Sequence, residues 1–247
     1  MRKELITKIQ EITKADVFTE QNIRDYFATD GSIFTQTPQA VVYPTNTKDV
    51  SQVVKILDEE ARSKRKTVGI TARGKGTDQS GGALGEGISL VFPAHMHHIL
   101  DVDKNLVTVQ PGVHYASLQR VLHSHGRFMP PYPSSINFCS IGGAIGTNAC
   151  GEKTIKYGST RDYVKSLKVV LSNGEVITTK RINAVQLARK KQQQTLEGKI
   201  YREVDALLMQ NHPLLSKAQP HTSKNAAGYD VWDVRGTYGS FDLTPLL

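Results

Sequence analysis

One stretch decides the fold of this chain: Cys139-Ser140-Ile141-Gly142-Gly143-Ala144-Ile145-Gly146-Thr147-Asn148-Ala149-Cys150-Gly151. Small residues dominate it, so its backbone can pack closely against a flat ligand. Ser140 and Asn148 add side chains that can donate hydrogen bonds to such a ligand. Taken alone, the stretch is equally typical of tight packing between a helix and a strand, which also selects glycine and alanine.

A second glycine-rich segment lies upstream, directly after a predicted strand, and reads Arg73-Gly74-Lys75-Gly76-Thr77-Asp78-Gln79-Ser80-Gly81-Gly82. Glycines allow backbone N–H groups to converge on an anion, because no Cβ blocks the approach. Thr77, Gln79 and Ser80 can add side-chain hydrogen bonds. The segment is typical of a pyrophosphate-binding loop, and a flexible surface loop is the alternative that its composition leaves open.

Spacing excludes two familiar nucleotide motifs from this second segment. A Walker loop needs Ser or Thr after its Gly-Lys pair, whereas Lys75 is followed by Gly76. The dinucleotide fingerprint of Rossmann domains needs a helix immediately after the glycines, whereas the loop here continues through Gly85. Any nucleotide bound here is therefore held by a different architecture.

The remaining sequence predicts a mixture of helices and strands. Apolar spacing indicates helices at 4–12, 20–27 and 115–125, and a long polar helical region over 183–210 with a solvated Lys- and Gln-rich middle. We expect strands at 40–44, 67–71, 88–92, 99–102 and 106–110, and a hairpin over 164–179 turned at Asn173-Gly174.

One strand–helix–strand unit is visible in the first third of the chain. Thr47 is expected to cap a helix between the strands at 40–44 and 67–71, and Asp49 places negative charge in its first turn. Such a crossover builds a parallel pair of strands. The helix is expected to bury one apolar face, formed by Val50, Val53, Val54 and Leu57.

Composition limits the class of protein. Of the 247 residues, 38% are hydrophobic and 22% charged, and the net charge is +8, as in an ordinary globular protein. No apolar run of about 18 residues or secretory leader is visible, so we expect a cytoplasmic protein without a transmembrane segment. The basic residues lack interleaved aromatic residues, so we expect no nucleic-acid partner.

Metal binding is not expected. The two cysteines, Cys139 and Cys150, cannot supply a zinc site. The cluster His95-Met96-His97-His98 lies between two predicted strands without a nearby carboxylate, so these residues are interpreted as turn histidines.

The motifs in order resemble a known family. Arg73-Gly74-x-Gly76-Thr77, Pro133-Ser134-Ser135, Cys139-Ser140-Ile141-Gly142-Gly143, Asn148-Ala149-x-Gly151 and Gly158-Ser159-Thr160-x-Asp162-x-Val164 resemble the FAD-binding domain of the vanillyl-alcohol oxidase / p-cresol methylhydroxylase superfamily. The most similar branch contains D-lactate dehydrogenase and the FAD subunit of glycolate oxidase. The resemblance covers roughly residues 26–247 and implies an α+β fold in which FAD lies between two subdomains.

The resemblance also implies a division of the chain. A helical lead is expected at 1–35, a first FAD-binding subdomain at 36–94, and a second at 95–247 with a helical insertion at about 178–222. The family continues with a Gly-Ser-Glu-Gly-type motif and a substrate domain, whereas this sequence ends at Leu247. We therefore expect the substrate domain to be absent and assign no catalytic residue.

The resemblance implies a set of cofactor contacts. The first loop would hold the pyrophosphate, and the second segment would line the flavin and ribityl side. The residues expected to bind FAD are Arg73, Gly74, Lys75, Gly76, Thr77, Asp78, Gln79, Ser80, Pro133, Ser135, Cys139, Ser140, Gly142, Gly143, Gly146, Asn148, Ala149, Gly158, Thr160 and Val164. Lys224 and Tyr229 are further candidates for an approach to the flavin.

The same resemblance predicts non-covalent FAD. A covalent link in this superfamily commonly uses a His in the first loop, and Thr77 stands at that place. A thiol link through Cys139 is the alternative, but its surroundings match the branch that binds FAD without a covalent bond.

The implied reaction is oxidation of a D-2-hydroxy acid, of the D-lactate or glycolate type, to a 2-oxo acid. Electrons would pass to a quinone, a cytochrome or an iron–sulfur protein, which makes peripheral attachment at the inner membrane face an alternative location. Two other functions stay open: a non-catalytic FAD-binding or electron-transfer subunit, and a reductase like the one that makes UDP-N-acetylmuramate.

Overall fold

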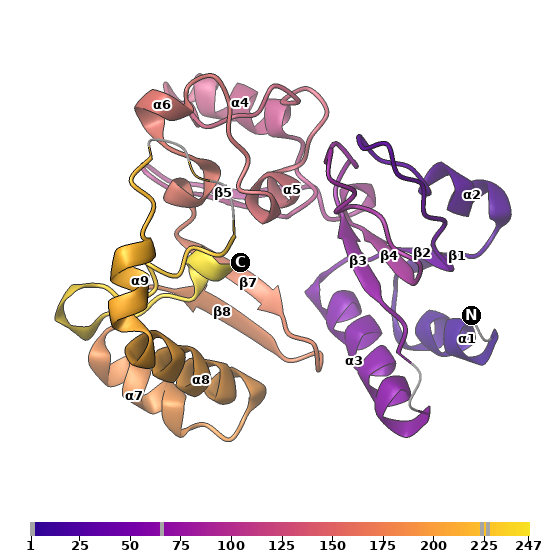
Figure 1. Cartoon of the computed structure of the whole chain (residues 1–247). Helices are drawn as coiled ribbons and strands as arrows, with labels where there is room; N and C mark the ends of the chain where they lie inside the picture. Colours follow the sequence, from indigo (N-terminus) through magenta and orange to yellow (C-terminus); the bar gives the residue numbers. More distant parts are fainter. Residues whose placement is uncertain (1–2, 65–66, 223–224, 226–227) are drawn as a thin grey trace.

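The first sheet is mostly parallel and forms the N-terminal part of the fold (Figure 1). The computed structural model describes residues 3–64, 67–222, 225 and 228–247. The sheet has the order β1 (Asp16–Phe18), β2 (Ala40–Tyr43), β4 (Ile88–Val91) and β3 (Ile70–Arg73). Strands β2 and β3 both run parallel to β4, and β1 is antiparallel to β2.

The predicted crossover is present, but its two strands are not neighbours. Helix α3 (Thr47–Lys64) joins β2 to β3, and β4 lies between them. The predicted helix cap at Thr47 is wrong, because Asn46 accepts the backbone N–H of Asp49 at 3.1 Å through its side chain. Asn is as good a cap as Ser or Asp, and Thr47 becomes the first helical residue.

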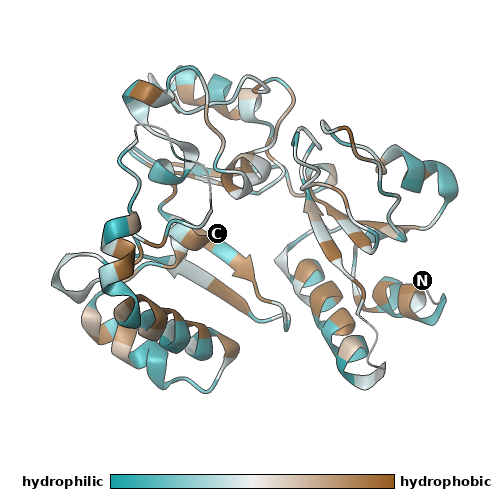
Figure 2. Cartoon of the chain, in the orientation of Figure 1, coloured by the Kyte–Doolittle hydropathy of each residue, from teal (hydrophilic) through white to brown (hydrophobic). Residues whose placement is uncertain are grey.

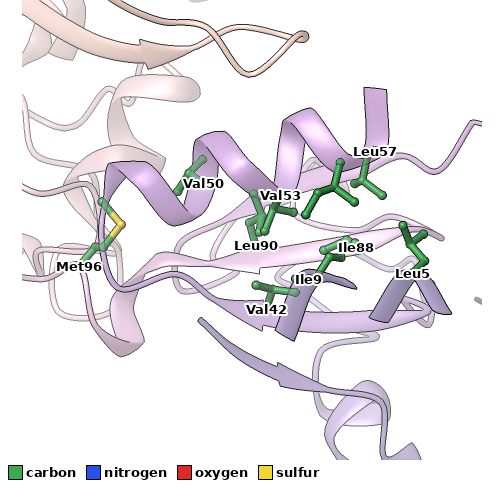
Figure 3. Packing of buried hydrophobic residues seen from close by; sticks show 10 residues of the cluster. Leu5, Ile9, Val42, Val50, Val53, Leu57, Ile88, Leu90 and Met96 are labelled. Atoms are coloured by element: carbon green, nitrogen blue, oxygen red, sulfur yellow. The ribbon is translucent and has the colours of Figure 1, made fainter. Parts of the chain in front are cut away.

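The main hydrophobic core lies between this sheet and two helices. Helix α3 turns its apolar face toward the strands, which is visible as a brown stripe in Figure 2. Helix α1 (Lys3–Ile12) packs beside it and buries Leu5 and Ile9. Figure 3 shows how these side chains meet those of β2 and β4. The buried members of this cluster are Leu5, Ile9, Val42, Val50, Val53, Ile56, Leu57, Ile88, Leu90 and Met96.

A second cluster lies in the middle of the chain. It is built by the two-stranded sheet β5 (Ile99–Val102) and β6 (Val107–Val109), helix α4 (Tyr115–Ser124) and the short helix α5 (Ile141–Gly146). Its buried members are Val113, Tyr115, Leu118, Leu122, Cys139, Ile141 and Ala144. The glycine-rich segment that opens α5 is therefore attached to its own apolar core. The short helices α2 (Gln21–Tyr26) and α6 (Thr154–Tyr157) lie on either side of this region in the sequence.

The C-terminal part contains the predicted hairpin, β7 (Ser166–Val170) paired antiparallel with β8 (Val176–Lys180). Its turn contacts the N-terminal part, because the Ser51 hydroxyl donates to the carbonyl oxygen of Gly174 at 2.5 Å. A third cluster follows, with buried residues Ile182, Leu187, Tyr201, Leu208, Val234, Phe241 and Leu243.

The region predicted as helical over 183–210 contains two helices. Helix α7 (Ala184–Gln192) ends before Thr195, whose side chain caps α8 (Leu196–Gln210) by accepting the N–H of Gly198 at 3.2 Å. A third helix, α9, spans His212–Ala218. The Lys-rich middle is also not simply solvated, because Lys190 and Lys191 form ion pairs with Glu197 at 2.5 Å and Asp205 at 2.6 Å.

No helix among the described residues combines the length and the apolar character that crossing a membrane requires.

Candidate functional site

The first glycine-rich segment is a loop that follows β3, the strand at one edge of the sheet. Gly76 and Gly81 adopt φ angles of +70° and +85°, which a side chain would strain. The Asp78 carboxylate holds the turn together by accepting the N–H groups of Ser80 at 3.0 Å and Gly82 at 2.7 Å and the Ser80 hydroxyl at 2.7 Å. These hydrogen bonds lower the pKa of Asp78, and the bond from the Ser80 hydroxyl has the largest effect.

The second segment begins with a buried helix cap. Ser140 is 1% exposed, and its Oγ accepts the N–H of Gly143 at 3.3 Å at the start of α5. Ile141 and Ala144 anchor α5 in the second cluster, whereas Gly143 and Gly146 are exposed. The exposed edge of α5 is therefore made of glycine backbone.

The two segments meet at Gly74 and Ser140. A Cβ at Gly74 would overlap Ser140 Oγ and would lie 3.9 Å from Gly143 Cα. The backbone that follows β3, beside the first hydrophobic cluster, thus contacts the capped start of α5, which packs on the second cluster. Figure 1 shows the β3 loop and α5 facing each other. This approach leaves no room for a side chain at Gly74, and a Cβ at Gly142 would instead meet Pro111.

A third stretch supports the end of α5. Asn148 has a φ of +43°, and its Oδ1 accepts the backbone N–H of Arg161 at 3.0 Å. Its Nδ2 is buried and has no hydrogen-bond partner within the described residues. A buried amide donor without a partner is costly, so this atom is available to a bound acceptor.

Two residues predicted to contact FAD direct their side chains to backbone carbonyls. Arg73 is 6% exposed, and its guanidinium donates to backbone carbonyls instead of facing the loop's outer surface. Thr160 is fully buried, and its hydroxyl donates to the carbonyl oxygen of Ala149 at 2.7 Å. Both residues therefore hold the site's backbone in place, and their side chains are not free for a cofactor.

The hydroxyl of Ser80 donates inside its own loop, so only its lone pairs are available. The other predicted contacts differ in exposure. Lys75 and Gln79 are exposed on the first loop, and Cys139 is buried. The half-buried ones are Gly74, Gly76, Thr77, Asp78, Pro133, Ser135, Gly142, Asn148, Ala149, Gly158 and Val164.

Sequence reasoning missed one wall of this region. Residues 29–35, to which no site residue was assigned from the sequence, lie against the glycine-rich loop. A Cβ at Gly31 would lie 2.9 Å from the Asp78 carbonyl oxygen, and one at Gly81 would lie 3.0 Å from the Phe34 ring. No motif marks this wall, because its contacts depend on which loops the sheet places together.

A polar pocket of about 210 Å³ adjoins the Gly158 stretch and was also not predicted. Arg161 lies in it with Nε 3.4 Å from a carboxylate oxygen of Asp230. Burial first, and then the neighbouring Asp233, raise the pKa of Asp230. Tyr229 is 75% exposed, and Lys224 lies outside the described residues.

The histidine cluster does not form a metal site within the described ranges. His97 and His98 stack on each other with ring centroids 4.8 Å apart. His95 instead contacts Asp16, with Nε2 and Oδ2 2.7 Å apart. The carboxylate beside His95 comes from β1, 79 positions away, and was not indicated by the sequence.

A family match and a set of similar curated proteins both identify an FAD-binding domain in this chain. Residues 38–180 match a family described as the FAD binding domain. The chain is 32% identical to a D-2-hydroxyglutarate dehydrogenase of Pantoea ananatis over 245 residues, covering 96% of this chain and 24% of that protein. It is 44% identical to the glycolate oxidase subunit GlcD of Bacillus subtilis over 146 residues, covering 58% of this chain and 30% of that protein.

Among solved structures, an alkyldihydroxyacetonephosphate synthase shares the fold with a TM-score of 0.62 at 20% identity. The match covers 72% of this chain and 34% of that one. Together these findings confirm the predicted α+β FAD-binding fold of the p-cresol methylhydroxylase type. The chain spans about a quarter of the length of the curated dehydrogenases that it matches.

Proposed function

The chain belongs to the FAD-binding domain family, and from this membership we propose that it carries the FAD site of a flavin-dependent dehydrogenase for D-2-hydroxy acids. The family match covers more than half of the chain, from residue 38 to residue 180, and includes both glycine-rich segments. The proposal assigns this chain the task of binding and orienting the cofactor.

The single observation that carries the proposal is the close approach of Gly74 to Ser140. It brings two loops with exposed backbone to one place, although 66 positions separate them in the sequence. The exposed Lys75 and Gln79 lie on one of these loops, and the exposed glycines of α5 lie on the other. A diphosphate and a planar ring need these two surfaces: convergent N–H donors and flat, unobstructed backbone.

The residues proposed to hold FAD follow from this geometry. Backbone donors from Gly74 to Gln79 bind the diphosphate, and Lys75 adds positive charge. The α5 segment lines the flavin side, with Asn148 Nδ2 as an available donor. The division into a helical lead at 1–35 and subdomains at 36–94 and 95–247 is part of this proposal, with FAD between the subdomains.

We propose that FAD is bound without a covalent link. Thr77 has no nucleophilic nitrogen. Cys139 is 4% exposed, and burial raises the pKa of its thiol, so it stays protonated and unreactive. Cys150 is half-buried and is not among the residues proposed to contact FAD.

When bound, FAD supplies the hydride acceptor for oxidation of a CH–OH group. The residues of this chain bind the cofactor, fix its orientation and keep water from its buried side. Catalytic residues for the hydroxy acid are not assigned to this chain.

D-2-Hydroxyglutarate is the first substrate to test. The match to the dehydrogenase named for it covers 96% of this chain, so it includes most of the helical segment α7–α9. The match to the glycolate oxidase subunit covers 58%. D-Lactate and glycolate are the next candidates, and a quinone, cytochrome or iron–sulfur protein is the proposed electron acceptor. We propose a cytoplasmic location.

The first test is a visible absorption spectrum of the purified chain, followed by titration with FAD and acid precipitation. We expect flavin bands that move fully into the supernatant. Bands that stay in the pellet would show a covalent link. If FAD binds but no 2-hydroxy acid reduces it, even in a chain extended beyond Leu247, the non-catalytic subunit becomes the better assignment.

A further inference from the structure

Arg73 is a buried cation whose hydrogen-bond partners are neutral. Nη2 donates to the carbonyl oxygen of Thr29 at 2.7 Å, and Nη1 lies 3.3 Å and 3.4 Å from those of Phe27 and Ala83. The guanidinium carbon also lies 5.3 Å from the centre of the Phe27 ring. Among the described residues it forms no ion pair with a carboxylate.

The guanidinium lies directly against the glycine-rich loop. A Cβ at Gly76 would overlap Nη2 of Arg73, and Gly76 is held at a φ of +70°. The three carbonyls that Arg73 binds belong to the two segments that border the loop, residues 27–29 and Ala83. The Arg73 side chain therefore links the start of the glycine-rich loop to Ala83 at its C-terminal end and to Thr29, where the wall of residues 29–35 begins.

The charge of Arg73 persists in this environment. Burial lowers its pKa and the charge of Asp30 raises it, but an arginine side chain keeps its proton in proteins. The glycine-rich loop therefore lies on a buried cation whose charge the nearby Asp30 carboxylate offsets in part.

We propose that Arg73 is a positioning residue for the FAD diphosphate: it shapes the Gly74–Gly76 turn through its three carbonyl contacts and places a buried positive charge beneath that turn. This inference rests on the proposed FAD site. It assigns Arg73 a role without direct contact to the cofactor, unlike the contact expected from the sequence.

The experiment measures the Kd of the full chain for FAD by flavin fluorescence, with Arg73→Lys and Arg73→Gln as test variants. Arg202→Lys is the matched control, because Arg202 also donates to two backbone carbonyls, those of Lys191 and Gln193. We expect Kd to rise about tenfold or more in both Arg73 variants, since neither Lys nor Gln reproduces the guanidinium fork that binds the three carbonyls. Arg202→Lys is expected to leave Kd within about twofold.

Salt dependence separates charge from shape. Added KCl weakens wild-type FAD binding if a positive potential attracts the diphosphate. We expect Arg73→Lys to keep this dependence and Arg73→Gln to flatten it. A purely structural role for Arg73 would weaken binding equally in both variants and leave the salt dependence unchanged, which would overturn the electrostatic part of the proposal.

A second pair of variants tests the same contact without changing Arg73, in case the Arg73 variants do not fold. Gly76→Ala pushes on the guanidinium from the loop side, and Gly126→Ala imposes the same positive-φ strain, at +66°, where nothing lies within 4 Å. We expect only Gly76→Ala to weaken FAD binding. Wild-type binding in folded Arg73 and Gly76 variants overturns the inference, whereas a wild-type chain that binds no FAD overturns the proposed function instead.

Discussion

The two glycine-rich segments are held in place by different forces. The first, residues 73–82, is a loop without a hydrophobic core of its own, and polar side chains fix its shape: the Arg73 guanidinium from below and the Asp78 carboxylate from within. The second, residues 139–151, is fixed by apolar anchors such as Ile141 in the second cluster. The first segment should therefore respond to charge and hydrogen bonding, and the second to volume.

The largest expected effect is on the apolar anchor of the second segment. Ile141→Ala removes a side chain that is 4% exposed and leaves a cavity, so we expect a loss of about 2–5 kcal/mol in unfolding free energy. Urea denaturation measures this change. Ile155→Ala, at a side chain that is 81% exposed, is the control and is expected to change stability by less than about 0.5 kcal/mol.

The contact between the segments is the next test. Gly74→Ala places a Cβ on Ser140 Oγ, and moving that oxygen breaks the cap of α5. We expect a loss of about 1–3 kcal/mol in unfolding free energy together with weaker FAD binding. Gly69→Ala, where nothing lies within 4 Å, is the control. The double variant with Ser140→Ala should recover part of the loss, and strict additivity would contradict the contact.

The helix cap itself is expected to have a smaller effect. Ser140→Ala removes the acceptor for the Gly143 N–H, at a cost of about 0.5–2 kcal/mol. Thr195→Ala removes the equivalent cap of α8, outside the proposed site. We expect similar losses of stability in the two variants, measured by thermal melting, but weaker FAD binding only in Ser140→Ala. Equal FAD affinities would mean that α5 does not contribute to the site.

The smallest expected effect is the pH response of the first loop. Hydrogen bonds hold the pKa of Asp78 below its ordinary value, so its contribution is complete above about pH 3.9 and is lost as pH falls through its folded-state pKa. Amide hydrogen exchange of Ser80 and Gly82 measures this loss. Asp78→Asn should remove the acid dependence of both amides, and an unchanged profile would assign it to another group.

Local signals explain why much of the fold was predictable. The apolar face of α3, the Asn173-Gly174 turn and the strand at β2 depend on near neighbours in the sequence, and all were predicted. The helix break at Thr195 was missed because polar residues continue across it. The cap at Asn46 was missed because Thr47, the next residue, also belongs to a type that commonly caps helices.

By itself, the sequence determined the composition of the candidate site: two segments rich in glycine and other small residues, the first of which contains no histidine. Only the tertiary structure decided how these residues are used. Arg73 and Thr160 carry good ligand chemistry in the sequence, but folding buries both and satisfies them with backbone carbonyls. The physical reason is that hydrogen-bonding capacity belongs to a residue type, whereas the partner is set by which distant segments the packed clusters bring together.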